Sequence, residues 1–410
     1  MGIDFGCLFQ KSDLTHRRTD SIDYDYYEEH PEDQEEIEVA EEQFARALGR
    51  VMPRLELLGF TLETARSEYE NMVSDAVEID SYVEPEDLPI KYLTFDEFCA
   101  LACRYPLADL CDKYIDHDSS NRDTLSHGRF ATSYDQFERV PRTDGPDFYW
   151  SEASFLSRRI CILSPQSMLW VFASSEANLE IEVTWEFGPI VHAGWVERGE
   201  FQPCARQTQR FLIATEGASD ARIIKRSFDV LQPDLTDFFH FVDVDERHHF
   251  WGSSNLVKFA EGLMRIEVLN KVLFVFDNDA EGVAAFRKLV SLDLPANMTA
   301  MIYPSLKEFE NFATLGPEGT GVSDINGRAA AIECYLDLRL QRRPTPKVIW
   351  SNYKKDISTW HGALDCKESY AKYFYAQTDA ELRNGSYDTS KLMELINELI
   401  RRSMPLESMI

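Results

Sequence analysis

The sequence predicts an α/β protein in which a mainly helical region with a small β element precedes a parallel sheet flanked by helices. Two apolar runs, at residues 211–215 and 272–276, have the length and the aromatic and branched side chains of fully buried strands. After each run, apolar residues recur at helical spacing. Strands are expected at 210–216, 238–244, 272–277 and 298–303, and helices at 219–231, 254–266 and 280–290. Such alternation is typical of a parallel sheet with right-handed crossovers.

The rest of the chain is expected to be mostly helical. Before the sheet, a short strand is expected at 5–9, helices at 35–72, 95–104 and 107–114, and two neighbouring strands at 179–185 and 190–195. After the sheet come a loop rich in Gly and Pro at 315–321 and a helix at 327–340. We therefore expect three domains, namely 1–205, 206–345 and a helical C-terminal extension, 346–410, that packs on the second.

Composition restricts the cellular setting. None of the apolar runs approaches the roughly 18–20 residues needed to span a bilayer. The N-terminus lacks the basic and apolar regions of a secretory signal. The eight cysteines are scattered and form no CxxC pair. We therefore expect a cytoplasmic protein with reduced thiols and no membrane association.

The net charge restricts the partners. The chain has 71 Asp and Glu residues against 42 Lys and Arg residues, a formal net charge of −29. Part of this acidity lies in the run 23–43, which is expected to be a solvated segment leading into a helix. Such a chain binds nucleic acid poorly by itself, because phosphate neutralisation supplies most of that affinity. A homo-oligomer or a separate partner protein is therefore expected to complete any nucleic-acid surface.

Acidic residues follow the two buried strands at the point where each strand ends. Glu216 and Asp220 follow the first strand, and Asp277 and Asp279 follow the second. Ligands of open α/β sheets bind at this carboxyl edge. Several carboxylates without cations favour a hard divalent ion, Mg²⁺ or Mn²⁺, which can promote displacement at phosphorus. The alternative interpretation is that these acids only cap helices or lie in solvated loops.

These residues resemble the Toprim domain, the catalytic fold of topoisomerases, bacterial primases and the overcoming-lysogenization-defect nucleases. The segments 216–220 (EGASD) and 276–282 (FDNDAEG) are most similar to the nuclease branch. More of the chain resembles the HEPN/Toprim-associated proteins of bacteria, in the stretches 54–61, 194–200, 252–255, 324–333 and 360–367. The resemblance implies a Toprim domain preceded by a HEPN-like domain.

The resemblance also implies roles for individual residues. Glu216 would be a metal ligand or general base, and Asp277 and Asp279 would be metal ligands. Asp220 would serve a second metal ion, and Lys367 would steady the phosphate. Asp324 and Glu333 match further carboxylates of the nuclease branch. The implied function is metal-dependent cleavage of nucleic acid, either DNA or RNA including tRNA, in anti-phage defence or as a toxin.

Related nucleases carry an ATPase in the same chain, and this sequence lacks one. The segment 316–323 has the spacing of a phosphate-binding P-loop, but Val322 stands where the loop needs Lys. Any ATP dependence is therefore expected to come from a separate partner, possibly an ATPase. Another pair of acids, Asp243 and Asp245, ends a strand, and we expect this pair to flank the site. His248 and His249 follow; they could contact phosphate, but two adjacent histidines on a loop more often face solvent.

Two other functions remain open at this point. Arg122 and His127 have the Arg-x4-His spacing of HEPN ribonucleases, in which the His acts on the ribose 2′-hydroxyl without a metal ion. The chain would then be a metal-independent ribonuclease with a structural Toprim domain. A chain with a charge of −29 could also be a non-enzymatic, acidic adaptor subunit that binds a basic partner in a defence complex.

Overall fold

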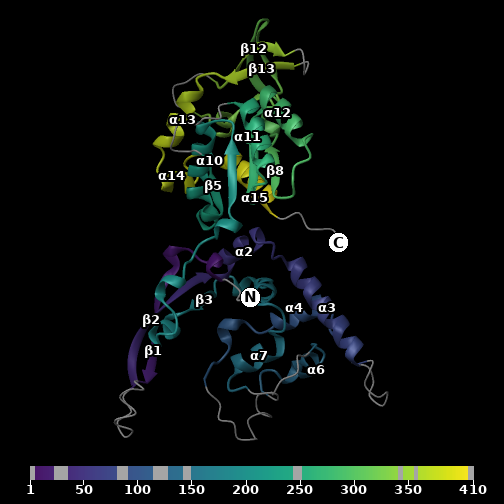
Figure 1. Ribbon diagram of the computed structural model, residues 1–410, viewed down its shortest axis with the longest axis vertical. Coiled ribbons are helices and arrows are strands. Elements are labelled where there is room, and N and C mark those ends of the chain that lie inside the picture. The colour runs from purple at the N-terminus through teal and green to yellow at the C-terminus, as the bar shows by residue number, and fades with distance from the viewer. Residues whose placement is uncertain are drawn as a thin grey trace. The chain divides into compact units, whose positions relative to one another are not determined.

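The computed structural model describes residues 5–22, 36–80, 91–113, 128–141, 149–242, 252–339, 345–354 and 359–404. The chain divides into two compact units, residues 1–204 and 205–410. As Figure 1 shows, the first unit holds an antiparallel sheet and a group of helices, and the second holds a parallel sheet flanked by helices. The predicted α/β architecture is therefore present in the second unit.

An antiparallel sheet of order β1-β2-β3 begins the first unit, from Leu14–Ile22, Glu36–Ala47 and Glu182–Glu186. Two 3-10 turns, η1 Phe5–Leu8 and η2 Lys11–Asp13, precede it, so the strand expected at 5–9 is wrong. The helix expected from residue 35 is also wrong in its first part. Ile37 and Val39 alternate with glutamates, which suits a strand, and β1 and β3 pair with the backbone of β2 on its two sides.

Two buried arginines bind the 3-10 turns η1 and η2 to the rest of this unit. Arg46 of β2 donates from Nε to Asp13 Oδ2 over 2.7 Å, and both side chains are almost fully buried. Arg54, in helix α2 (Leu48–Leu57), donates from Nε to the carbonyl of Cys7 over 2.8 Å. Each arginine thus satisfies groups that burial would otherwise leave unpaired.

The helices of the first unit pack around aromatic side chains. They comprise α3 Leu62–Asp80, α4 Phe95–Ala102, α6 Tyr134–Phe137, α7 Glu152–Ile160 and α8 Pro165–Ala173. Thr94, Ser151 and Ser164 cap three of them by accepting a backbone N–H. The helix expected at 107–114 is only a 3-10 turn, η3 (Leu107–Asp109), and the strand expected at 190–195 is helix α9 (Gly188–His192). Pro189 favours this helix because its fixed φ suits a first turn.

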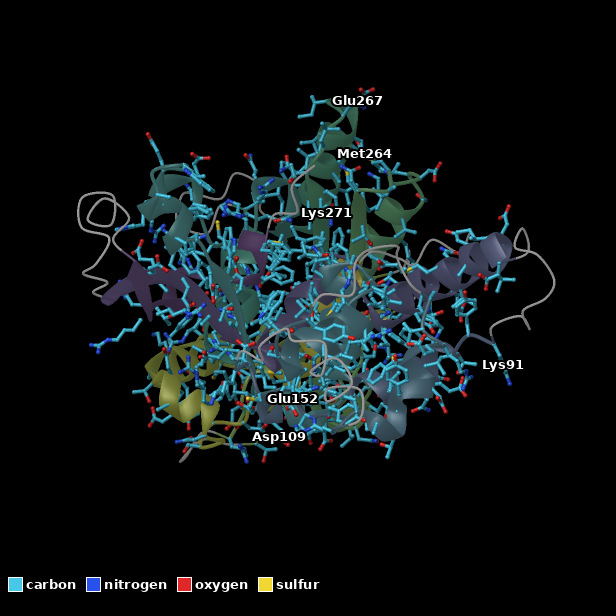
Figure 2. All side chains as sticks on the ribbon, turned by 90° about the horizontal axis from the view of Figure 1, so that it is seen from below. Lys91, Asp109, Glu152, Met264, Glu267 and Lys271 are labelled. Atoms are coloured by element: carbon cyan, nitrogen blue, oxygen red, sulfur yellow. The ribbon has the colours of Figure 1, made fainter. Side chains whose placement is uncertain are left out.

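Arg129 connects two of these elements. It donates from Nη1 to the carbonyl of Asp109 over 2.8 Å, and its Nε lies 3.6 Å from Oε1 of Glu152 at the start of α7. Figure 2 labels Asp109 and Glu152, which lie near one another. In neither unit do the described residues include a helix that is both long and apolar enough to cross a membrane.

The parallel sheet of the second unit has the order β5-β4-β6-β8. Its strands are β4 Phe211–Thr215, β5 Phe239–Phe241, β6 Lys271–Phe276 and β8 Met298–Ile302. Helices α10 Ala218–Leu231, α11 Ser253–Arg265 and α12 Ala280–Val290 connect them. All seven elements were predicted from the sequence, because each keeps one apolar period from end to end. One face of the sheet packs on α11 and α12.

A second, four-stranded sheet of order β10-β9-β12-β13 belongs to the same unit. Its strands are β9 Phe312–Gly316, β10 Gly319–Ser323, β12 Val348–Lys354 and β13 Thr359–Leu364. The loop expected at 315–321 is therefore the turn of the β9–β10 hairpin. The region expected to be a helical extension from residue 346 also opens with two strands. The strands β7 (Asn278–Asp279) and β11 (Ala329–Ala330) form a separate short pair.

Helices α13 Lys367–Ala376, α14 Asp379–Arg383 and α15 Ser390–Ser403 end the described chain. The helix expected at 327–340 is wrong, because β11 and the 3-10 turn η10 (Ile332–Tyr335) occupy that segment.

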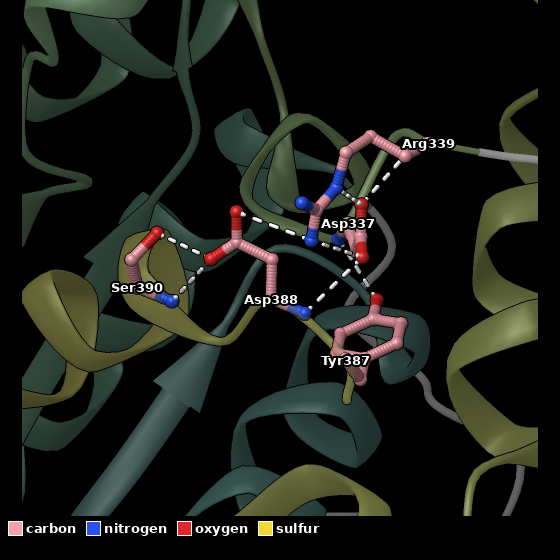
Figure 3. Close-up of polar contacts among 5 residues, drawn as sticks. All are labelled: Asp337, Arg339, Tyr387, Asp388 and Ser390. Atoms are coloured by element: carbon pink, nitrogen blue, oxygen red, sulfur yellow. Dashed lines mark hydrogen bonds and ion pairs between the residues drawn. The ribbon is translucent and has the colours of Figure 1, made fainter. Parts of the chain in front are cut away.

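Asp337, just after η10, joins this turn to the start of α15 (Figure 3). It accepts three hydrogen bonds of 2.9 Å from Arg339, two from the guanidinium and one from the backbone N–H, and the backbone N–H of Asp388 donates to it over 3.1 Å. The backbone N–H of Asp337 donates to Tyr387 Oη over 2.9 Å. The segments at residues 337 and 388 are therefore held together by charge-assisted bonds.

Candidate active site

Two adjacent parallel strands place the first pair of acids. The two strands end within one residue of each other in the sheet register, since Thr215 pairs with Val275, so Glu216 and Asp277 follow the strands at the same edge. The backbone N–H of Asp277 donates to Glu216 Oε1 over 3.1 Å. From β4 the chain passes to β5 on one side, and after α11 it returns to β6 on the other side. The two acids thus lie at the switch point where open α/β sheets bind ligands.

Gly282 allows this pair to approach. A Cβ on this residue would lie 2.2 Å from the carbonyl oxygen of Asp277 and 2.8 Å from Glu216 Oε1. Both separations are far below contact distance, so any side chain would displace the backbone of Asp277. The glycine of the Asp-x-Asp-x-x-Gly motif is therefore required by the close packing of α12 against the acids.

The other two acids of the motifs are held by helix starts. Asp220, in the first turn of α10, accepts from the backbone N–H of Gly217 over 3.1 Å. Asp279 caps α12 and accepts from Glu281 N and Gly282 N over 2.9 and 2.7 Å. Helix-capping was the alternative interpretation for these acids, and Asp279 does cap a helix while one oxygen still points elsewhere, since Oδ2 lies 4.0 Å from His361 Nδ1.

The remaining predicted residues divide into two groups. Glu333 is buried in η10 and interacts electrostatically with both Asp220 and Asp277, and Lys367 Nζ lies 3.7 Å from its Oε1. The structure thus brings Glu333 and Lys367 to the acids. Asp324 is exposed, and its carboxylate accepts from the backbone and the side chain of Asn326 over 2.9 and 2.8 Å.

Burial and mutual repulsion raise the pKa values of three acids. Burial, followed by repulsion from Asp279, raises the pKa of Glu216 to about 8. Burial, followed by repulsion from Glu333, raises the pKa of Asp220 to about 7. The pKa of Asp277 lies well above its usual value, again mainly because of burial, with repulsion from Asp220 and Glu216 added. The site therefore concentrates negative charge in a poorly solvated place.

The donor atoms fit a hard divalent cation in their chemistry. Asp277 Oδ1 is buried and, among the described residues, has no hydrogen-bond partner. Oxygen donors in excess of positive charge suit Mg²⁺ or Mn²⁺. However, no three His, Cys, Asp or Glu side chains within the described part of the chain are arranged as a ready set of ligands. Backbone amides hold one oxygen each of Glu216, Asp220 and Asp279.

Sequence reasoning missed two residues at this edge. Tyr303 directly follows β8, and its buried hydroxyl is without a hydrogen-bond partner among the described residues. Burial, followed by the charges of Asp220 and Asp277, raises its pKa, so the hydroxyl lies near these acids. Its place after a buried strand was a usable signal. His361 of β13 faces Asp279. It lies in the stretch 360–367, which resembles the family, but the segment was expected to be helical and His361 was not singled out.

Several residues singled out in the sequence lie outside the described residues. They are Arg122 and His127 of the second possible site, Asp243 and Asp245, which were expected to flank the acids, and the two histidines that follow them, His248 and His249.

Comparison with protein families identifies a family that matches the first unit. The family model described as HEPN/Toprim N-terminal domain 1 matches residues 1–209, half of the chain. The chain belongs to this HEPN/Toprim family. The match covers the first compact unit and ends just before β4 at Phe211, so the acidic edge lies beyond it. Comparisons with curated proteins and with solved structures gave no match.

Proposed function

We propose that this HEPN/Toprim family member is a metal-dependent nuclease whose second unit is a Toprim domain of the overcoming-lysogenization-defect type. The observation that carries the proposal is the group of buried carboxylates at the switch point of a parallel sheet. Its central member, Asp277, has a buried oxygen that no described residue contacts by a hydrogen bond. The HEPN/Toprim name of the family that matches the first unit supports a role connected with nucleic acid.

Asp277, Asp279, Glu216 and Asp220 would hold the metal ions, with Glu333 beside Asp220. A bound Mg²⁺ or Mn²⁺ supplies Lewis-acid activation of the phosphodiester. Glu216 Oε1 accepts from the N–H of Asp277, so the other carboxylate oxygen remains to take a proton from an attacking water. Lys367, whose side chain is 49% exposed, is within reach of both Glu333 and solvent and would bind a phosphate oxygen.

The setting of this activity is part of the proposal. The substrate is DNA or RNA, with tRNA included, and the protein acts in the bacterial cytoplasm in defence against phage or as a toxin. Because the chain carries a charge of −29, a homo-oligomer or a separate partner, possibly an ATPase, supplies the basic surface.

The test compares wild type with Asp277→Asn. Wild type should cleave plasmid DNA or total RNA in Mg²⁺ or Mn²⁺ and lose this activity in EDTA, whereas Asp277→Asn should be about a hundred- to a thousandfold slower. Calorimetric titration with Mn²⁺ gives a readout that does not depend on cleavage, and the heat of binding should disappear in the variant. Asp229→Asn changes an exposed acid of α10 and serves as the matched control.

Equal cleavage by wild type and Asp277→Asn would overturn the metal-site assignment. Metal-independent cleavage of RNA that is lost in the double variant Arg122→Ala/His127→Ala would identify a HEPN ribonuclease instead. Binding of a basic partner, unchanged in Asp277→Asn and without cleavage in any metal ion, would identify an adaptor.

A further inference from the structure

The four-stranded sheet of the second unit presents glycines and one flat indole on the same face. Trp350 of β12 pairs with Gly362 of β13. A Cβ on Gly362 would lie 2.7 Å from Trp350 Cε3, and a Cβ on Gly316 of β9 would lie 3.1 Å from Trp350 Cδ1. The indole therefore lies across three strands, over two residues that have no side chain. Such a flat surface is unusual for a sheet, where side chains normally stand upright.

Two more aromatic rings extend this face toward the end of the β12–β13 hairpin. Tyr353 and Trp360 are cross-strand partners, and the pairing skips Ser351, so the bulge returns Tyr353 to the side of Trp350. Their ring centroids are 5.6 Å apart at an interplanar angle of 73°. The two residues remain 50% and 37% exposed, although large aromatic side chains are usually buried. We call Trp350, Tyr353 and Trp360 the aromatic face.

The charge of this sheet differs from that of the whole chain. Asp and Glu make up 71 of the 410 residues, yet none occurs in β9, β10, β12 or β13. The only basic residues of the four strands are Lys354, which ends β12, and His361. A polyanion that the rest of the protein repels can therefore approach this sheet without meeting carboxylates on its strands.

The aromatic face adjoins the acids of the candidate active site. Trp360 and His361 are consecutive in β13 and therefore point to opposite sides of the strand. On the side opposite Trp360, His361 Nδ1 lies 4.0 Å from Asp279 Oδ2. One strand thus separates a stacking surface from the carboxylates that we propose to bind metal.

We propose that the aromatic face stacks unpaired bases of single-stranded nucleic acid and holds the adjoining phosphodiester at the acidic edge. This inference rests on the proposed nuclease function and names its substrate class. Bases stack on exposed aromatic side chains whatever their sequence, and this contribution does not require phosphate neutralisation. Stacking therefore gives a protein of charge −29 a means of holding nucleic acid. Bases in an intact duplex are already stacked and cannot use the face.

The test measures binding separately from cleavage. In the Asp277→Asn background, labelled single-stranded DNA and RNA oligonucleotides and the matching duplexes are titrated, and fluorescence anisotropy is recorded. Single strands should bind more tightly than duplexes. Tyr353→Ala/Trp360→Ala should weaken single-strand binding by about tenfold or more and leave duplex binding unchanged. Trp360→Phe should retain most of the affinity because it keeps a ring.

Trp195→Ala is the matched control, since this tryptophan is 80% exposed in the first unit and should not affect binding. Circular dichroism of each variant verifies that the fold is retained. Equal single-strand binding by the Asp277→Asn protein with and without Tyr353→Ala/Trp360→Ala, or a preference for duplexes, would overturn the inference. A shift from a larger species to a monomer in that variant, with no single-strand binding by wild type, would also overturn it and assign the face to a protein partner.

The two proposals fail in different ways. Metal-dependent cleavage of duplexes that is insensitive to Tyr353→Ala/Trp360→Ala would support the nuclease proposal and contradict the role of the aromatic face. Single-strand binding through the aromatic face, together with equal cleavage by wild type and Asp277→Asn, would support the role of the aromatic face and contradict the metal site.

Discussion

Two groups of buried carboxylates in the second unit, one around Asp337 and one around Asp277, have pKa values that are shifted in opposite directions. At Asp337, burial alone would raise the pKa, but hydrogen bonds from Arg339 and from backbone amides outweigh it, so the pKa lies below its ordinary value. At Asp277, burial and four neighbouring acids all act in the same direction and raise the pKa. The first group is neutralised by its own chain and stabilises the fold. The second is left uncompensated, which is typical of a site that binds a cation.

The largest effect is expected from Gly282→Ala, which brings a side chain into the uncompensated group. The new Cβ would meet the carbonyl of Asp277 at 2.2 Å, so the backbone must shift, and cleavage should fall by a hundredfold or more, about 3 kcal/mol in activation free energy. Gly262→Ala in α11 is the matched control. It has open space around it and should be neutral or stabilise the protein by about 0.5–1 kcal/mol. Similar activity of the two variants would contradict the packing argument.

Asp337→Ala removes the compensated group and should lower the free energy of unfolding by about 2–3 kcal/mol at pH 7, as measured by urea denaturation. The pKa of Asp337 is lowered in the fold, so this contribution should be present above the ordinary aspartate pKa and disappear as the pH falls through the lowered value. Asp229→Ala, which removes an exposed ion pair with Lys225, should change stability by less than about 1 kcal/mol.

Glu216→Gln should change the free energy of unfolding in the opposite direction to Asp337→Ala. Because the pKa of Glu216 is raised to about 8, the metal-free fold loses stability as the pH rises from the ordinary glutamate pKa toward 8. The variant should therefore be more stable than wild type by about 1–2 kcal/mol at pH 8.5 and equal to it near pH 4. Urea denaturation in EDTA at the two pH values measures this difference. A variant that is less stable at both would show that Glu216 is compensated like Asp337.

Lys367→Ala should have the smallest effect, about a tenfold loss of kcat/KM, because an exposed lysine contributes one charged contact to a phosphate. Lys372→Ala, an exposed lysine of the same helix, should cleave like wild type. Steady-state rates on one defined oligonucleotide compare the two variants. If both lose activity equally, Lys367 acts only through the general charge of α13.

The sequence predicts the parallel sheet well because each strand and helix has one clear apolar period. The positions of Glu216 and Asp277 follow from the ends of those strands. The β12–β13 hairpin was not predicted because the bulge at Ser351 interrupts the alternation of apolar and polar residues along β12. His361 lies in this hairpin and was therefore not predicted to face the acids. The segment 327–340 has the composition of a helix, but Ala329 and Ala330 pair with β7, so tertiary pairing overrides local propensity.

The bonds between Asp337 and Asp388 bear on how the protein can be divided for study. Through them the last helix is anchored next to η10, and α15 buries Leu392, Leu395, Ile396 and Leu399 completely. Upstream of α15, Arg383 Nε donates to the carbonyl of Val230 at the end of α10, the helix that begins beside Asp220. A fragment cut after residue 345 would contain the four motif acids but would expose apolar surface where this last segment packs. A folded fragment that contains the acidic edge therefore requires the chain to continue through residue 403.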